Sequence, residues 1–114
     1  MWYNNIKVLG KVIVMNISKG NKEQLAKALA ASLPMLRAKM GISQTDLADM
    51  VEVTRQTISA FESGQRDMPW NMFLAFMMVF TSDPVTKRLL EAMEIYNDDF
   101  KMFINVKLGE YNGN

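Results

Sequence analysis

Arg55 and Gln56 are the two side chains of this sequence whose hydrogen-bonding groups are best suited to reading a base pair. A guanidinium offers two parallel donors to the edge of guanine, and a carboxamide offers a donor and an acceptor to the edge of adenine. The nearby residues Thr57, Ser59 and Ala60 are small or polar. A short helix beginning here would present this set at its N-terminal end, where side chains can enter the major groove of DNA.

Catalytic chemistry has little support in the composition. The 114 residues include no Cys and no His. A disulfide framework, a Cys-based zinc site and nucleophilic catalysis by a Ser–His or Cys–His pair are therefore excluded. The neighbouring carboxylates Asp98 and Asp99 would point in different directions on a helix and make a poor acid–base pair. We expect a protein that is not an enzyme and that needs no metal and no cofactor.

Residues 43–64 have the pattern of two short helices joined by a tight turn. Ser43 and Thr54 are suitable N-caps, and Asp46 stands three places after Ser43 in a position typical of a capping box. Only Glu52 and the residue after it remain to reverse the chain. The apolar residues recur at helical spacing in each half. They are Leu47, Ala48, Val51, Val53, Ile58 and Phe61.

This pattern resembles the Cro-type (XRE-like) helix-turn-helix of phage repressors, over about residues 25–80. The matching residues are Leu36, Arg37, Gly41, Ile42, Ser43, Gln44, Leu47, Ala48, Val53, Thr54, Arg55, Gln56, Thr57, Ile58, Ser59, Glu62, Ser63 and Gly64. The resemblance implies that Gln44 contacts a DNA phosphate. It also implies base contacts by Arg55, Gln56, Thr57, Ser59 and Ala60. One departure is Glu52, which stands where the family usually has Gly, and a positive φ there would cost on the order of 1 kcal/mol.

Two further sets of residues are singled out. Glu62 lies near the C-terminal end of the second helix, where the helix macrodipole disfavours an anion, so a partner is expected. In the resembling family the matching Arg and Glu pair beneath the motif, which implies a structural ion pair between Arg37 and Glu62. Thr54 opens the second helix, and Gln65 and Arg66 follow it in a loop. We expect these three residues to contact phosphate.

Two apolar segments flank the motif. Leucines at helical spacing predict a helix over residues 22–39, and Pro34 predicts a kink or a break near Ser32. A helix over residues 69–81 is apolar on all sides, so we expect part of it to meet a second subunit or a C-terminal segment. Met78 and Phe80 are the candidates for such an interface. The alternative is that the helix is ordinary core covered by the C-terminal helix.

The two ends of the chain are less defined. The β-branched residues of segment 1–18 favour a strand, although Met15 as the true start is an alternative. A helix is expected over residues 84–97, with Met93 on its buried face. Residues 97–99 either end that helix or begin another. The segment 100–108 suits a helix better than a strand, and residues 109–114 have the composition of a frayed tail.

These observations predict an all-α fold, a compact bundle of four to five helices containing the helix-turn-helix, with a short N-terminal β element as an option. Three parts are expected: an extension over residues 1–21, strand or partly disordered; a DNA-binding domain over residues 22–81; and a helical segment with a tail over residues 82–114. The net charge is only +1, but residues 1–40 carry +6 and residues 41–114 carry −5. Such an asymmetry is compatible with one basic face toward phosphate.

The expected function is sequence-specific binding of double-stranded DNA by a transcriptional repressor, with residues 54–61 in the major groove. We expect a cytoplasmic homodimer on a palindromic operator and no membrane contact. Two alternatives stay open. One is an antitoxin that binds DNA and a protein toxin, and the other is an interaction module without DNA binding.

Overall fold

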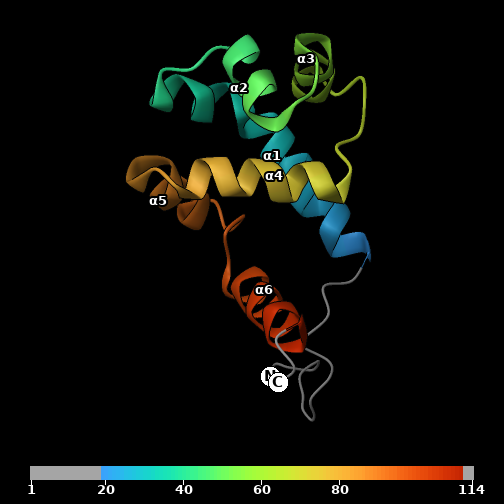
Figure 1. Ribbon diagram of the computed structural model, residues 1–114, viewed down its shortest axis with the longest axis vertical. Coiled ribbons are helices and arrows are strands. Elements are labelled where there is room, and N and C mark those ends of the chain that lie inside the picture. Colours follow the sequence, from blue (N-terminus) through green and yellow to red (C-terminus); the bar gives the residue numbers. More distant parts are fainter. Residues whose placement is uncertain (1–18, 112–114) are drawn as a thin grey trace.

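The computed structural model describes residues 19–111, and this part of the chain contains six helices and no strand. The predicted all-α class is confirmed, whereas the N-terminal strand expected over residues 1–18 lies outside the described residues. Figure 1 shows α2 and α3 together at one end of the long axis, α4 crossing α1 in the middle, and α6 at the opposite end. The helices are α1 (Lys19–Met40), α2 (Gln44–Val51), α3 (Arg55–Ser63), α4 (Trp70–Thr81), α5 (Pro84–Ala92) and α6 (Asp98–Tyr111).

The core is built around the leucine stripe of α1. Leu29, Leu33 and Leu36 are fully buried. Each such side chain contributes roughly 1.5–3 kcal/mol relative to leaving it in water. The same core takes in Phe61 of α3 and Leu90 of α5. Packing is therefore continuous across position 82, where the sequence suggested a boundary between two parts.

Of the two outcomes predicted at Pro34, a kink or a break, the break into two pieces is wrong. A single helix of 22 residues runs through Pro34. A proline in a helix interior costs about 3 kcal/mol because it removes a hydrogen bond and crowds the preceding turn. The leucines on both sides of Pro34 are fully buried, and their burial outweighs this cost. Pro34 itself is exposed.

The ends of α2 and α3 are held by the caps that the sequence predicts. The backbone N–H of Asp46 donates to Ser43 Oγ at 3.0 Å, and the N–H of Ser43 donates to Asp46 Oδ2 at 2.9 Å. The latter bond is the main reason that the pKa of Asp46 lies below its usual value. Thr54 Oγ1 accepts from the N–H of Thr57. Both short helices thus begin where their orphan N–H groups find acceptors.

The turn between α2 and α3 has a positive φ at Glu52, the condition under which the sequence predicts strain there. Glu52 has φ 60° and ψ 46°, a left-handed conformation. Its N–H donates to the carbonyl of Ala48, which closes α2. A side chain with a Cβ is strained there, because the Cβ approaches the carbonyl oxygen.

The helix predicted over residues 84–97 ends earlier, at Ala92. Glu94 adopts φ 59°, and the N–H groups of Ile95 and Tyr96 both donate to the carbonyl of Leu90. Ile95, not Met93, is therefore the residue that enters the core after α5. No sequence signal marks this stop, since residue 94 is neither Gly nor Asn.

Residues 97–99 begin a new helix and do not extend α5. Asn97 Oδ1 accepts from the N–H of Phe100 at 2.8 Å and caps α6. The predicted helix over residues 100–108 is confirmed. It continues to Tyr111, so the tail expected from residue 109 is partly helical, and residues 112–114 lie outside the described residues.

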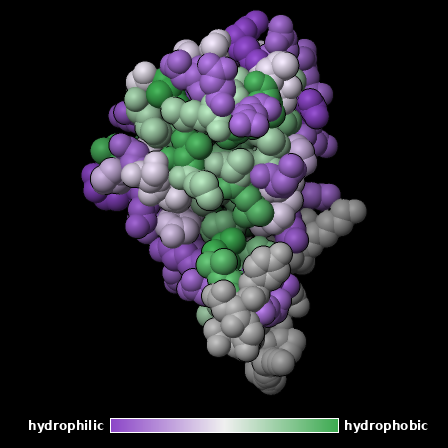
Figure 2. All heavy atoms as spheres, in the orientation of Figure 1, coloured by the Kyte–Doolittle hydropathy of each residue, from purple (hydrophilic) through white to green (hydrophobic). Residues whose placement is uncertain are grey.

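α4 is buried on one side only. Phe73, Phe76, Met77 and Phe80 lie in the core, so Phe80 is wrong as an interface candidate. Met78 leaves 76% of its surface exposed. Figure 2 shows that hydrophobic residues gather over the middle of the face that α4 crosses in Figure 1. Among the described residues, no helix is long and apolar enough to cross a membrane.

Replacing Glu52 with Gly should stabilise the fold by about 1 kcal/mol, because Gly adopts positive φ without steric strain. Urea unfolding followed by circular dichroism measures this. Glu52→Ala is the matched control, since it removes the carboxylate but keeps the Cβ and should not stabilise. A Gly variant no more stable than the Ala variant would show that the turn stores no strain.

Candidate nucleic-acid interface

α3 has separate inward and outward faces. Ile58 and Phe61 point inward and are buried. With about 100° between successive residues, Arg55, Ser59, Gln56 and Ala60 follow one another around the opposite face. Arg55 and Gln56 are exposed in the first turn, and Ser59 and Ala60 are half-buried. Four of the five predicted base-contact residues therefore share one continuous surface.

Thr57 is the fifth predicted residue, and it lies at the edge of the buried face. Its N–H donates to Thr54 Oγ1 at 3.2 Å, and the two hydroxyl oxygens are 3.0 Å apart. Thr57 and Thr54 thus form the cap of α3 together. The position of Thr57 around the helix points away from the surface that the other four residues share.

Arg55 is held by Gln44 from the first turn of α2. Arg55 Nη1 donates to Gln44 Oε1 at 3.2 Å, and Gln44 Nε2 donates to Glu62 Oε1 at 2.9 Å. Gln44 therefore bridges the first and the last turns of α3. The resemblance implies a phosphate contact for Gln44 but not these two partners, because their approach depends on how α2 crosses α3.

The expected pair of Arg37 and Glu62 lies beneath this bridge. Arg37 Nε donates to Glu62 Oε2 at 2.7 Å, and Nη2 donates to Oε1 at 3.0 Å. The side chains are 17% and 8% exposed. The hydrogen bonds to Glu62 raise the pKa of Arg37 above its usual value, against the opposing effect of burial. A third bond runs from Nη1 to the carbonyl of Ile42, so the pair joins α1, the approach to α2, and α3.

The remaining phosphate candidates lie at the far end of α3. Gln65 and Arg66 are exposed and follow the C-terminal end of α3, whereas Arg55 is the first residue of that helix. The N–H of Arg66 donates to the carbonyl of Ala60, and its guanidinium lies 5.5 Å from the ring centre of Phe61. The structure thus brings Gln44 and Arg55 together and places Gln65 and Arg66 apart from them.

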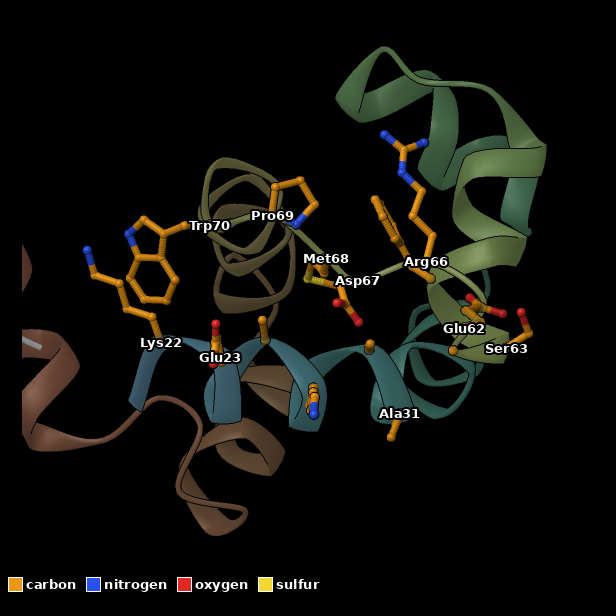
Figure 3. Close-up of a pocket in the computed structure, with 15 residues that line it drawn as sticks. Lys22, Glu23, Ala31, Glu62, Ser63, Arg66, Asp67, Met68, Pro69 and Trp70 are labelled. Carbon is orange, nitrogen blue, oxygen red and sulfur yellow. The ribbon is translucent and has the colours of Figure 1, made fainter. Parts of the chain in front are cut away.

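A groove of about 830 Å³ runs between α1 and the connection from α3 to α4. Figure 3 shows Arg66 and Asp67 leaving this connection in different directions, with Lys22 and Trp70 at the far end of the groove. Basic and acidic side chains alternate along it, so it has no uniform potential toward a phosphate backbone. Within residues 19–111, no group of His, Cys, Asp and Glu is suited to hold a metal ion.

Two short capped helices, a tight turn and an outward polar face define a helix-turn-helix of the DNA-binding class. Residues 35–69 match the family model described as Helix-turn-helix (HTH_3). This segment, which runs from the last turns of α1 to the residue before α4, has the helix-turn-helix of that family, and the match supports the resemblance to XRE-like transcription regulators. That fold is a DNA-binding one and is not typically enzymatic. Neither the curated proteins nor the solved structures gave a match to the chain.

Removing one partner of the ion pair between Arg37 and Glu62 should strongly destabilise the fold. Arg37→Met and Glu62→Leu should each lower the free energy of unfolding by about 3 kcal/mol, because each leaves a largely buried charge without its partner. The double variant should lose less than the sum of the two single losses, since no charge is then left alone. Urea unfolding of all three proteins measures this. Single variants that unfold like the wild type would reduce the pair to a surface contact.

Proposed function

We propose that this protein binds double-stranded DNA sequence-specifically as a transcriptional repressor, with residues 54–61 in the major groove. The observation that carries the proposal is the surface shared by Arg55, Gln56, Ser59 and Ala60, which is outward and takes no part in the core. Such a surface at the N-terminal end of a recognition helix is what base reading requires. The helix-turn-helix match over residues 35–69 supports it.

The hydrogen-bonding capacity of Gln44 supports a double role. Its amide nitrogen carries two hydrogens, and Glu62 accepts only one of them. The second remains for a phosphate oxygen, while Oε1 keeps its bond from Arg55. The guanidinium of Arg55 has five donors, of which this bond uses one. Gln44 can thus fix the protein on the backbone and, at the same time, orient Arg55 toward the edge of guanine.

We also propose that the protein acts as a homodimer on a palindromic operator. The exposed Met78, on a helix otherwise rich in buried aromatic residues, favours a protein partner for the outer face of α4. A second copy is the partner that suits a palindromic site, because the symmetry of the site then mirrors that of the dimer. A toxin bound at the same face is the alternative, in which the protein is an antitoxin.

Base reading predicts different behaviour for three variants. Arg55→Ala and Gln56→Ala should each lose about 1–3 kcal/mol of binding free energy on the preferred DNA site. Each should also reduce the preference for one base over the others at a single base pair. Arg66→Ala should weaken binding to all DNA sequences alike. It should also reduce the slope of log affinity against log salt concentration by about one unit. The measurement is binding to a site selected from random DNA and to its single-base variants, at several salt concentrations.

Arg88→Ala is the matched control, because it removes an exposed arginine from α5 and should leave binding unchanged. If Arg55→Ala and Gln56→Ala lower affinity equally for every variant of the site, neither residue reads sequence. A wild-type protein that shows no salt-dependent binding to random duplex DNA would instead be an interaction module without DNA binding.

Met78→Glu should give a folded monomer with weaker operator affinity, because a charge placed in an apolar interface is desolvated without a partner. Sedimentation at tens of micromolar and circular dichroism measure association and folding. Met35→Glu makes the same change at another exposed methionine, on α1, and should leave the dimer intact. A wild-type protein that sediments as a monomer would rule out this dimer.

A further inference from the structure

The groove between α1 and the connection from α3 to α4 has apolar walls on both sides. On the side of α1 the lining includes Ala26 and Ala30, whose short side chains leave space. Buried Phe61 and Met68 lie against the groove from the other side. Its volume of about 830 Å³ lies within the range of sites that take a ligand. An apolar segment of a chain could therefore be buried there.

The connection along this groove carries backbone groups without partners. Within residues 19–111, the N–H groups of Asp67 and Met68 donate no hydrogen bond, and the carbonyls of residues 64–68 accept none. Met68 is only 7% exposed, so water has little access to its N–H. A buried N–H without an acceptor is unfavourable, and nearly all such groups in folded proteins are paired. Unpaired groups of this kind are what an extended segment uses when it adds as a further strand.

The charges of the groove favour a basic occupant. Glu23 and Asp67 enter no ion pair within the described part of the chain. Two of the cations that line the groove, Lys22 and Arg66, lie over aromatic rings. Lys27, the remaining cation, is in no ion pair either. Two unpaired carboxylates against one such lysine favour a segment that carries Lys or Arg and no acid.

The segment before α1 has a matching composition. Eleven of residues 1–18 are apolar, none is acidic, and Lys7 and Lys11 are basic. Residues 12–15, with the sequence VIVM, form a continuous apolar run in which three of the four side chains are β-branched. Such residues favour an extended conformation, and their exposure to water is unfavourable. The run therefore suits an apolar groove with unpaired backbone groups.

The segment is also attached at the right place. α1 begins at Lys19, one turn before Lys22, and Figure 3 shows Lys22 at one end of the groove and Ser63 at the other. Residues 16–18 are enough for a turn that leads the chain back alongside α1. An extended residue advances about 3.3 Å and a helical one about 1.5 Å, so residues 12–15 can follow about two turns of α1. The attachment keeps the run at a high effective concentration near the groove.

We propose that residues 12–15 dock in this groove as an extended strand of the same chain, with one of their carbonyls accepting from the N–H of Met68. Val12 and Val14 share one face of such a strand and cover the apolar wall that includes Phe61. The lysine that precedes the run lies close enough to pair with a carboxylate of the groove. The proposal does not require DNA binding, and its failure would leave the proposed function untouched.

Hydrogen exchange of the full-length protein tests the pairing. The amide of Met68 should exchange roughly a hundredfold more slowly than an unpaired amide, because its N–H is bonded to the segment. Val14→Asp should remove this protection, since a carboxylate in an apolar groove is desolvated without a partner. Val8→Asp makes the same change outside the run and should keep the protection. A Met68 amide that exchanges fast in the wild type would overturn the proposal, and so would protection that Val14→Asp leaves unchanged.

The position of the segment can be measured because the chain has no Cys. A nitroxide attached to the variant Ile13→Cys should broaden the amide signals of Ala31 and Ser63, at the far end of the groove. The amides of Asn105 and Val106 on α6 should stay sharp, because α6 does not line the groove. Equal broadening of both sets would show a segment that is not seated in the groove and would contradict the proposal.

A mixture of chains separates docking within one chain from docking on a second copy. Nitroxide-bearing chains with natural nitrogen are mixed with nitrogen-15 chains that carry no nitroxide. Docking within one chain predicts that the amide of Ser63 keeps its full intensity in this mixture. Broadening of Ser63 there would show that a second copy supplies the segment, and docking within the same chain would be wrong.

Discussion

The bidentate ion pair between Arg37 and Glu62 connects the scaffold with the surface that faces outward. It joins the last turn of α1 to the last turn of α3, and it is largely shielded from water. A short helix such as α3 has little stability of its own. Its position depends on Ile58 and Phe61 in the core and on this pair at its end.

The pair also extends toward the proposed DNA contacts. Glu62 Oε1 accepts from both Arg37 and Gln44, and Gln44 in turn accepts from Arg55. In this row of four side chains, Arg37 and Glu62 at one end are largely buried, and Arg55 at the other end is exposed. The orientation of Arg55 is therefore set from within the fold, which reduces the entropy lost when a side chain is ordered on binding.

The helix-turn-helix could be predicted because it depends on local sequence signals. Features that depend on packing between distant segments could not be predicted from the sequence. Ser43, Asp46 and Thr54 act through neighbours within three residues, so their roles could be read from spacing. The continuity of α1 through Pro34 could not, because it depends on burial against α3 and α4. The early end of α5 was missed since Glu94 adopts a conformation usually signalled by Gly or Asn. The partners of Gln44 depend on a helix crossing that no spacing specifies.

The separation of the two faces of α3 bears on how the specificity of such a protein can change. Gln56, Ser59 and Ala60 contribute little to the core, and within residues 19–111 the side chain of Gln56 makes no hydrogen bond. Substitutions at these positions are nearly free of folding constraints, since surface changes away from packed or bonded groups alter stability little. Arg55 is different because it shares a bond with Gln44. Under the proposed base reading, evolution or design could therefore redirect the helix to new DNA sequences one position at a time, whereas a new residue at position 55 calls for a matching change at position 44.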